Sequence, residues 1–224
     1  MNDNLITRKI KYSVDTLEEA KVIFDIQKQY SNCLHFTYNR LFENNKLSTK
    51  ELTALQKDLN NIELNSHLKN SAIYDAKALI NRDNRHQIIF GGKKLFFDRL
   101  NNKISKDEFK LNRLSTIYSI GESCKNGNRL FEIIDENTIL FKPSRNTHIL
   151  LYLKTSKSCK KELLKLQELM NSKSISVTIS LDQNYVYFTF NYNKIKARQI
   201  VNSKIKNRIF SIDQNPNYLG WSVV

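Results

Sequence analysis

Apolar and polar residues alternate in two separate parts of the chain, which predicts β-strands. Residues 5–14 alternate, with Thr7, Lys9 and Lys11 forming the polar side. Strand-like segments return later and cover residues 117–120, 130–134, 138–141, 148–153 and a hairpin over 175–191 that turns at 182–184. An isolated strand among helices leaves its backbone groups unpaired, so we expect the first strand to join the later ones.

Apolar residues at helical spacing occupy the region between these two parts. Three Ser/Thr-x-x-Glu capping boxes open helices there, at Thr16 with Glu19, Ser48 with Glu51, and Ser105 with Glu108. The first helix is expected to run to about Phe42, and another begins near Ser66. One more helix, over residues 157–171, lies among the later strands. The predicted fold class is therefore α+β, with a small antiparallel β-barrel interrupted by a helical insertion.

The final residues predict a strand, a turn and a second strand. Ile209 to Ile212 is apolar, the Asn-Pro-Asn at 215–217 breaks the strand, and Leu219 begins a second apolar stretch. Asp213 then lies where the first strand ends. Metal-dependent nucleases hold Mg²⁺ with carboxylates at such points; an aspartate that only caps a hairpin turn is the alternative.

The charge is strongly positive and unevenly distributed. The chain has 36 Lys and Arg against 22 Asp and Glu, a net charge of +14. Residues 1–80 hold 11 basic and 10 acidic side chains, so the remaining residues hold 25 and 12. A lysine-rich coding bias would raise lysine in both parts alike. The asymmetry favours a polyanion-binding function, with nucleic acid as the partner.

The highest density of positive charge surrounds the adjacent glycines Gly91 and Gly92. Adjacent glycines indicate a bend or a close backbone approach. Nine basic residues fall within 32 positions, and with one later arginine they are the candidate nucleic-acid-binding residues: Arg82, Arg85, Lys93, Lys94, Arg99, Lys103, Lys106, Lys110, Arg113 and Arg129.

Other classes of site find little support. Cys33, Cys124 and Cys159 are widely spaced and lack the close pairs of a structural zinc site. The four histidines are scattered, without a metal-binding or catalytic signature. No apolar stretch approaches the roughly 20 residues of a membrane span, and the polar start is no signal peptide. We expect a cytoplasmic protein without a membrane partner.

Three segments resemble the TnpB (OrfB) transposon-encoded RNA-guided nucleases and the related type V CRISPR effectors. In order, they are Phe90-Gly91-Gly92-Lys93-Lys94, Ser119-Ile120-Gly121-Glu122 with the following Lys125 to Arg129, and Arg208 to Asp213 with the Asn-Pro-Asn-Tyr that follows. The resemblance spans about residues 88–224. It implies a wedge-like β-barrel from residues 1–14 and 115–195, a recognition insertion over 15–114, and over 196–224 a linker and the start of a RuvC/RNase H-like nuclease domain.

By this resemblance the chain holds a guide RNA and target DNA through its basic stretch, while base pairing supplies the sequence information. Asp213 takes the place of the first of three carboxylates that bind two Mg²⁺ ions. The second and third acidic motifs and the relatives' zinc-binding cysteines are not in this sequence. We therefore expect the amino-terminal part of an RNA-guided DNA endonuclease, inactive alone and completed by a carboxy-terminal half or a second copy, with Mg²⁺ bound only then.

Two non-enzymatic alternatives remain open. In the first alternative, the chain is a stand-alone nucleic-acid-binding regulator that retains Asp213 from a nuclease ancestor. Alternatively, it is an RNA-binding β-barrel protein in which Tyr185 and Tyr187 stack on bases, although packing in the core is the commoner fate of such rings.

Overall fold

The fold is known from a computed structural model, which divides into two compact units that we describe separately. One is Leu5–Phe190, and the other joins Met1–Asn4 to Asn191–Val224. The structure describes residues 4–43, 54–55, 57–82 and 87–195, and the backbone alone at 210–215 and 218–223.

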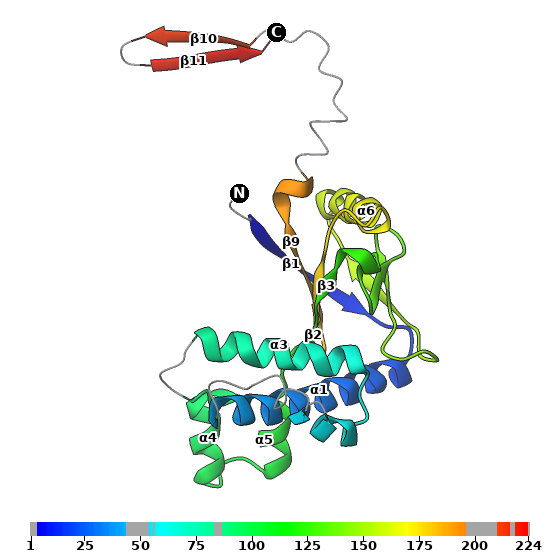
Figure 1. Cartoon of the computed structure of the whole chain (residues 1–224), viewed down its shortest axis with the longest axis vertical. Helices are drawn as coiled ribbons and strands as arrows, with labels where there is room; N and C mark the ends of the chain where they lie inside the picture. The colour runs from blue at the N-terminus through cyan, green and yellow to red at the C-terminus, as the bar shows by residue number, and fades with distance from the viewer. Residues whose placement is uncertain are drawn as a thin grey trace. The chain divides into compact units, whose positions relative to one another are not determined.

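A curled, antiparallel seven-stranded half-barrel organises the larger unit (Figure 1). The strand order is β2-β8-β9-β1-β7-β6-β5, so the first strand of the chain lies in the middle of the sheet. Its strands are β1 (Leu5–Ser13), β2 (Ile117–Ser119), β5 (Phe131–Ile133), β6 (Thr138–Phe141), β7 (Ile149–Lys154), β8 (Thr178–Leu181) and β9 (Tyr185–Asn191).

One face of the sheet is buried because apolar residues alternate along each long strand. In β9 the residues Val186, Phe188 and Phe190 are buried, whereas those between them are half-exposed. Helix α6 (Lys157–Asn171) covers this face with the apolar stripe that its sequence predicts. Arg8, on the same side of β1 as Ile10, pairs with Glu162 of α6 at 2.8 Å. The main core lies between sheet and helix.

Two helices pack against each other at the end of the sheet away from α6 (Figure 1). They are α1 (Leu17–Glu43) and α3 (Ser66–Arg82). The predicted capping box forms, since the amide of Glu19 donates to Thr16 Oγ1 and the amide of Thr16 donates to the Glu19 carboxylate, both at 3.1 Å. Tyr30 Oη of α1 donates to Asp75 of α3 at 3.2 Å. Burial raises the pKa of both groups, which keeps this phenol a donor.

The predicted β-barrel is present as a half-barrel, because the sheet stays open between its edge strands β2 and β5. A short hairpin of β3 (Gly121–Glu122) and β4 (Gly127–Asn128) lies between these edges in the sequence, where we expected only turns. The buried Asn128 amide donates to the carbonyls of Ser119 and Val177 at 3.1 and 3.0 Å, and its oxygen accepts from the amide of Leu130 at 3.0 Å. One side chain thus satisfies backbone groups that a closed ladder would have paired.

Other boundaries also differ from prediction. Strand β8 begins at Thr178 rather than at Ile175. In the smaller unit, β10 (Phe210–Asn215) and β11 (Tyr218–Val223) form a hairpin in which Asp213 pairs with Gly220. Asp213 is therefore inside a strand and not at its end, because hairpin pairing extends the strand through polar residues. The predicted capping box at Ser48 and Glu51 lies outside the described residues.

Candidate nucleic-acid interface

The basic segment folds into a helical hairpin of α4 (Gly92–Leu100) and α5 (Lys106–Asn112), called the α4–α5 hairpin below. Gly91 precedes it with φ +84°, a conformation that favours glycine. The turn closes when Arg99 Nη1 donates to the carbonyl of Ile104 at 3.3 Å. Ser105 then caps α5 by accepting from the amide of Glu108 at 3.1 Å, as the sequence predicts.

Helix α1 holds both ends of the hairpin through one face. The amide of Ile88 donates to Tyr38 Oη at 2.8 Å, and the amide of Ser115 donates to Ser31 Oγ at 2.7 Å. The ring of Phe90 lies on His35, with centroids 3.8 Å apart. Burial, with the nearby Arg113 charge, lowers the pKa of His35 to about 4, so this ring is neutral at pH 7. The hairpin is therefore anchored at its base.

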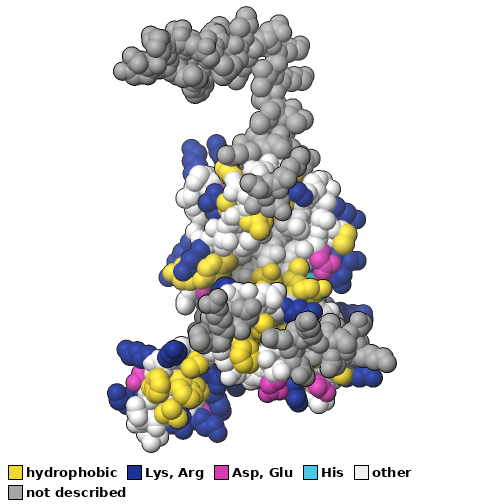
Figure 2. Space-filling model, turned by 60° about the vertical axis from the view of Figure 1, so that its left-hand side comes forward, with side chains coloured by type: hydrophobic (Ala, Val, Ile, Leu, Met, Phe, Trp, Pro, Cys, Tyr) yellow, Lys and Arg dark blue, Asp and Glu magenta, His cyan; other side chains and the backbone are white. Residues whose placement is uncertain are grey.

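Seven of the ten predicted cations lie on this hairpin, and its five lysines are exposed. In Figure 2, Lys and Arg side chains surround a projecting lobe, which is the α4–α5 hairpin. Lys103 and Lys110 approach acidic neighbours only loosely, at 3.8 and 3.7 Å. Lys93, Lys94 and Lys106 make no ion pair with any residue that the structure describes. Such lysines are available to phosphate groups.

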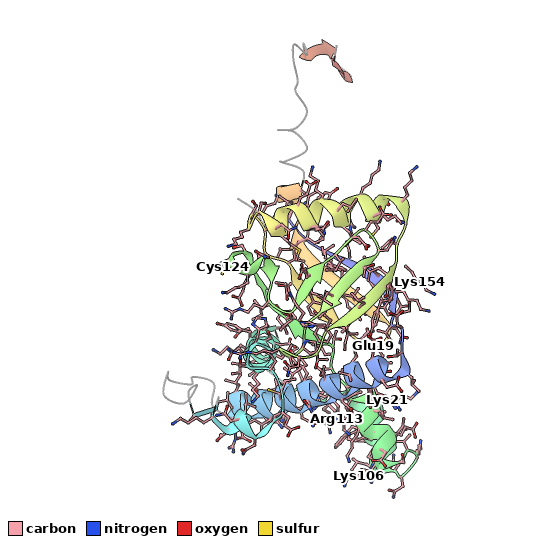
Figure 3. All side chains as sticks on the ribbon, turned by 90° about the vertical axis from the view of Figure 1, so that its right-hand side faces the viewer. Glu19, Lys21, Lys106, Arg113, Cys124 and Lys154 are labelled. Carbon is pink, nitrogen blue, oxygen red and sulfur yellow. The ribbon has the colours of Figure 1, made fainter. Side chains whose placement is uncertain are left out.

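The two arginines of the hairpin are different from its lysines. Arg99 is half-buried and closes the interhelical turn. Arg113 is half-buried at the base, where its guanidinium lies 4.9 Å from the Phe109 ring centroid. Figure 3 shows Arg113 where the hairpin returns toward α1, and Lys106 farther from that helix. These arginines support the hairpin, while the lysines form its outer surface.

The remaining predicted site residues lie outside residues 92–113 of the chain. Arg82 is exposed in the last turn of α3, and Arg85 lies outside the described residues. Arg129 donates to Glu122 at 2.7 Å near the β3–β4 hairpin, so its charge is already paired. Asp213 belongs to the smaller unit, and only its backbone is described.

Four large apolar side chains of the hairpin point outward, which the sequence did not reveal. Their exposed fractions are 37% for Phe96, 55% for Phe97, 58% for Leu100 and 53% for Leu111. In residues 92–112, all of which are described, no side chain of α4 or α5 is buried. Apolar spacing along a helix does not show whether another element covers that face, so the exposure of these residues could not be predicted.

A second feature is a cavity of about 630 Å³ between α3 and β2–β3, lined by residues that include His67, Tyr74, Tyr118 and Glu122. His67 Nε2 lies 3.2 Å from Ser119 Oγ, and its Nδ1 lies 3.5 Å from the Glu122 carboxylate. This order of atoms is similar to that of a hydrolase triad. Ser119, however, is 0% exposed and donates to Asn128, so no substrate reaches it. The cluster is structural.

The tyrosines of β9 are not in the core, because they share the sheet face opposite α6. Lys9 Nζ lies 3.9 Å from the ring centroid of Tyr185, and Tyr187 Oη donates to Asp182 at 2.8 Å. Burial and, after it, that hydrogen bond raise the pKa of Tyr187 to about 12. Both rings already have partners within the chain, so we leave them out of the candidate interface.

A family model described as the SSO2105 N-terminal domain matches residues 5–197. The chain belongs to this family. The match covers the half-barrel and the α4–α5 hairpin, and it ends before β10 and Asp213. No curated protein and no solved structure matches the chain.

Within the described part of this SSO2105 N-terminal domain, no three His, Cys, Asp or Glu side chains gather as a metal site. The same residues include no helix long and apolar enough to cross a membrane.

Proposed function

We propose that the chain binds RNA and DNA through the α4–α5 hairpin, as the guide- and target-binding part of an RNA-guided DNA endonuclease similar to TnpB. One observation carries the proposal. Five exposed lysines gather on a helical hairpin that buries none of its own side chains and is anchored to α1.

The electrostatics of the hairpin favour a phosphate backbone as the ligand. From Gly92 to Arg113 there are seven Lys and Arg against three Asp and Glu, a difference of four positive charges. Lys93, Lys94 and Lys106 are exposed and lack acidic partners in the described chain, so phosphates displace no internal ion pair there. Such contacts release counterions and do not depend on sequence. This agrees with a guide that supplies specificity by base pairing.

The same proposal assigns an identity to each part of the fold. The half-barrel corresponds to a wedge-like domain, and β10–β11 to the first strands of a RuvC-like nuclease domain. The family description names an amino-terminal domain, which supports a place before a further domain. The alternative, a stand-alone regulator, needs no such domain. Replacing Asp213 with Ala distinguishes them, since it abolishes cleavage by a completed nuclease and leaves repression by a regulator unchanged.

The proposed binding includes no step that involves magnesium. Carboxylates from more than one residue hold a two-metal site, and the described side chains form no such group. Asp213 would contribute one ligand once further carboxylates join it. The function that we assign to this chain alone is binding.

The test is the binding of labelled RNA and DNA by the purified chain over a range of salt concentrations. We expect the variant Lys93→Gln/Lys94→Gln/Lys106→Gln to bind more weakly and to make the negative slope of log K against log salt less steep by about two to three units. The matched control is Lys125→Gln/Lys157→Gln/Lys161→Gln, which removes the same charge from exposed positions outside the hairpin. Equal losses in both variants, or no binding by the unaltered chain at low salt, would contradict the proposal.

A further inference from the structure

We propose that the exposed apolar side chains of the α4–α5 hairpin stack on unpaired bases, so that the hairpin prefers single-stranded nucleic acid to a duplex. The inference rests on the proposed function and adds to it the form of the ligand. The four side chains concerned, called the apolar patch below, are Phe96, Phe97, Leu100 and Leu111.

Three of the four side chains in the apolar patch are more than half exposed. Phe97 and Leu100 are each more than half exposed, and Leu111 of the facing helix is also more than half exposed. The rings of Phe96 and Phe97 are 5.8 Å apart and nearly perpendicular, at 70°. Figure 2 shows hydrophobic side chains together on this lobe with basic side chains around them. Contiguous apolar surface with a polar rim marks a binding site.

The rim decides which kind of ligand fits the apolar patch. Lys93, Lys94 and Lys106 are exposed on the same two helices, where positive charge exceeds negative by four. A protein partner would have to combine an apolar centre with a strongly acidic border. Every nucleotide of a nucleic-acid strand meets both requirements, because its base offers an apolar face and its phosphate carries a negative charge. Aromatic side chains interleaved with cations are the usual arrangement of single-strand binding sites.

A duplex cannot use the apolar patch in the same way. Its base faces are covered by stacking on neighbouring pairs, so a duplex offers the hairpin only phosphates and groove edges. An unpaired stretch exposes its base faces, and each stacked base adds affinity without reading sequence. The lysines therefore bind both forms, whereas the two phenylalanines distinguish them.

The experiment compares three variants of the full chain on single strands and on a duplex of the same sequence. Phe96→Leu/Phe97→Leu keeps apolar side chains and every lysine but removes the aromatic faces. We expect it to bind single-stranded RNA or DNA roughly tenfold more weakly and the duplex unchanged. Phe96→Tyr/Phe97→Tyr keeps the rings and should bind as the unaltered chain does. Tyr74→Leu removes an exposed aromatic side chain from α3 and is the matched control.

A second measurement reports stacking directly. A single-stranded oligonucleotide with 2-aminopurine should change its fluorescence on binding to the unaltered chain and to the tyrosine variant, but not to the leucine variant. Equal affinity of the leucine variant and the unaltered chain for single strands overturns the inference, while the lysine test still stands. An apolar patch that mediates self-association also overturns it: sedimentation then shows a dimer that the leucine variant loses, with nucleic-acid binding unchanged.

Discussion

The half-barrel and the α4–α5 hairpin use apolar residues in opposite ways. In the half-barrel, alternate residues such as Ile139, Leu151 and Phe188 are 0% exposed beneath α6. In the hairpin, Phe97 and Leu100 are more than half exposed, and lysines surround them. Burying a large apolar side chain contributes about 1.5–3 kcal/mol to stability, and the hairpin does without most of this contribution. This contrast supports the binding function proposed for the hairpin.

Replacing one phenylalanine in each region with alanine should give the largest difference in the free energy of unfolding between these regions. Phe188→Ala opens a cavity in the packed core, so we expect a loss of about 3–5 kcal/mol in the free energy of unfolding. Phe97→Ala removes a mostly exposed ring and should cost less than about 1 kcal/mol. Urea denaturation followed by circular dichroism measures both. Similar losses in the two variants would show that the hairpin ring is buried in solution and would remove the contrast.

The second prediction concerns Asn128, which belongs to the short hairpin that lies between the edge strands of the half-barrel in the sequence. Asn128→Ala leaves buried backbone groups of β2, β5 and the segment before β8 without partners, so we expect a loss of about 3 kcal/mol. Asn126→Ala is the control at a neighbouring exposed amide. Because Asn126 has φ +50°, its replacement should still cost about 1 kcal/mol. Equal losses would mean that the Asn128 hydrogen bonds contribute little to stability.

His35 of α1, whose ring lies on Phe90 at the base of the hairpin, should make stability depend on pH. Its pKa is lowered to about 4 in the folded chain, while an unfolded histidine titrates near 6.5. As the pH falls from 6.5 toward 4, the unfolded state binds a proton that the folded state excludes, so stability decreases in that interval. His35→Gln should remove about 2 kcal/mol of this decrease. The measurement is the free energy of unfolding at pH 7 and at pH 4.5, with His148→Gln, at an exposed histidine, as the control. The same pH dependence of stability in the two variants would contradict the prediction.

The smallest expected effect is at the base of the hairpin. Gly91→Ala forces a side chain into φ +84° and places its Cβ 2.5 Å from Leu95 Cδ2, whereas Gly92→Ala shares the positive φ but meets no atom within 4 Å. The φ strain alone costs about 1 kcal/mol in each variant. We expect faster amide hydrogen exchange over residues 92–112 in both variants, and more in Gly91→Ala. Unchanged exchange in Gly91→Ala would show that the hairpin tolerates this contact.

Much of the larger unit followed from local patterns. The alternation over 175–191 and the turn at 182–184 predicted the β8–β9 hairpin, although β8 begins three residues later than expected. Helix α6 has the bounds 157–171 that its apolar spacing indicated. Capping at Thr16 and Ser105 was also predictable, because a cap depends on residues within one turn. The open sheet edge was not predictable, because it depends on the Asn128 side chain, which reaches residues as far away as Val177.

The candidate site divides in the same way. The sequence alone located the cluster of basic residues near Gly91, because charge and spacing are local properties. It could not tell that Arg99 and Arg113 support the hairpin while Lys93 and Lys94 face solvent.

By itself the sequence determined the strands of the seven-stranded sheet, most helices, the positive charge and the glycines that allow the bend at residue 91. The tertiary structure decided which apolar faces are covered, and it left Phe97 and Leu100 exposed while it buried Phe188. The physical reason is that helical or strand periodicity requires only that an apolar face exists. Whether that face is buried depends on a second element brought there by the fold, and in the described chain Phe97, Leu100 and Leu111 stay more than half exposed.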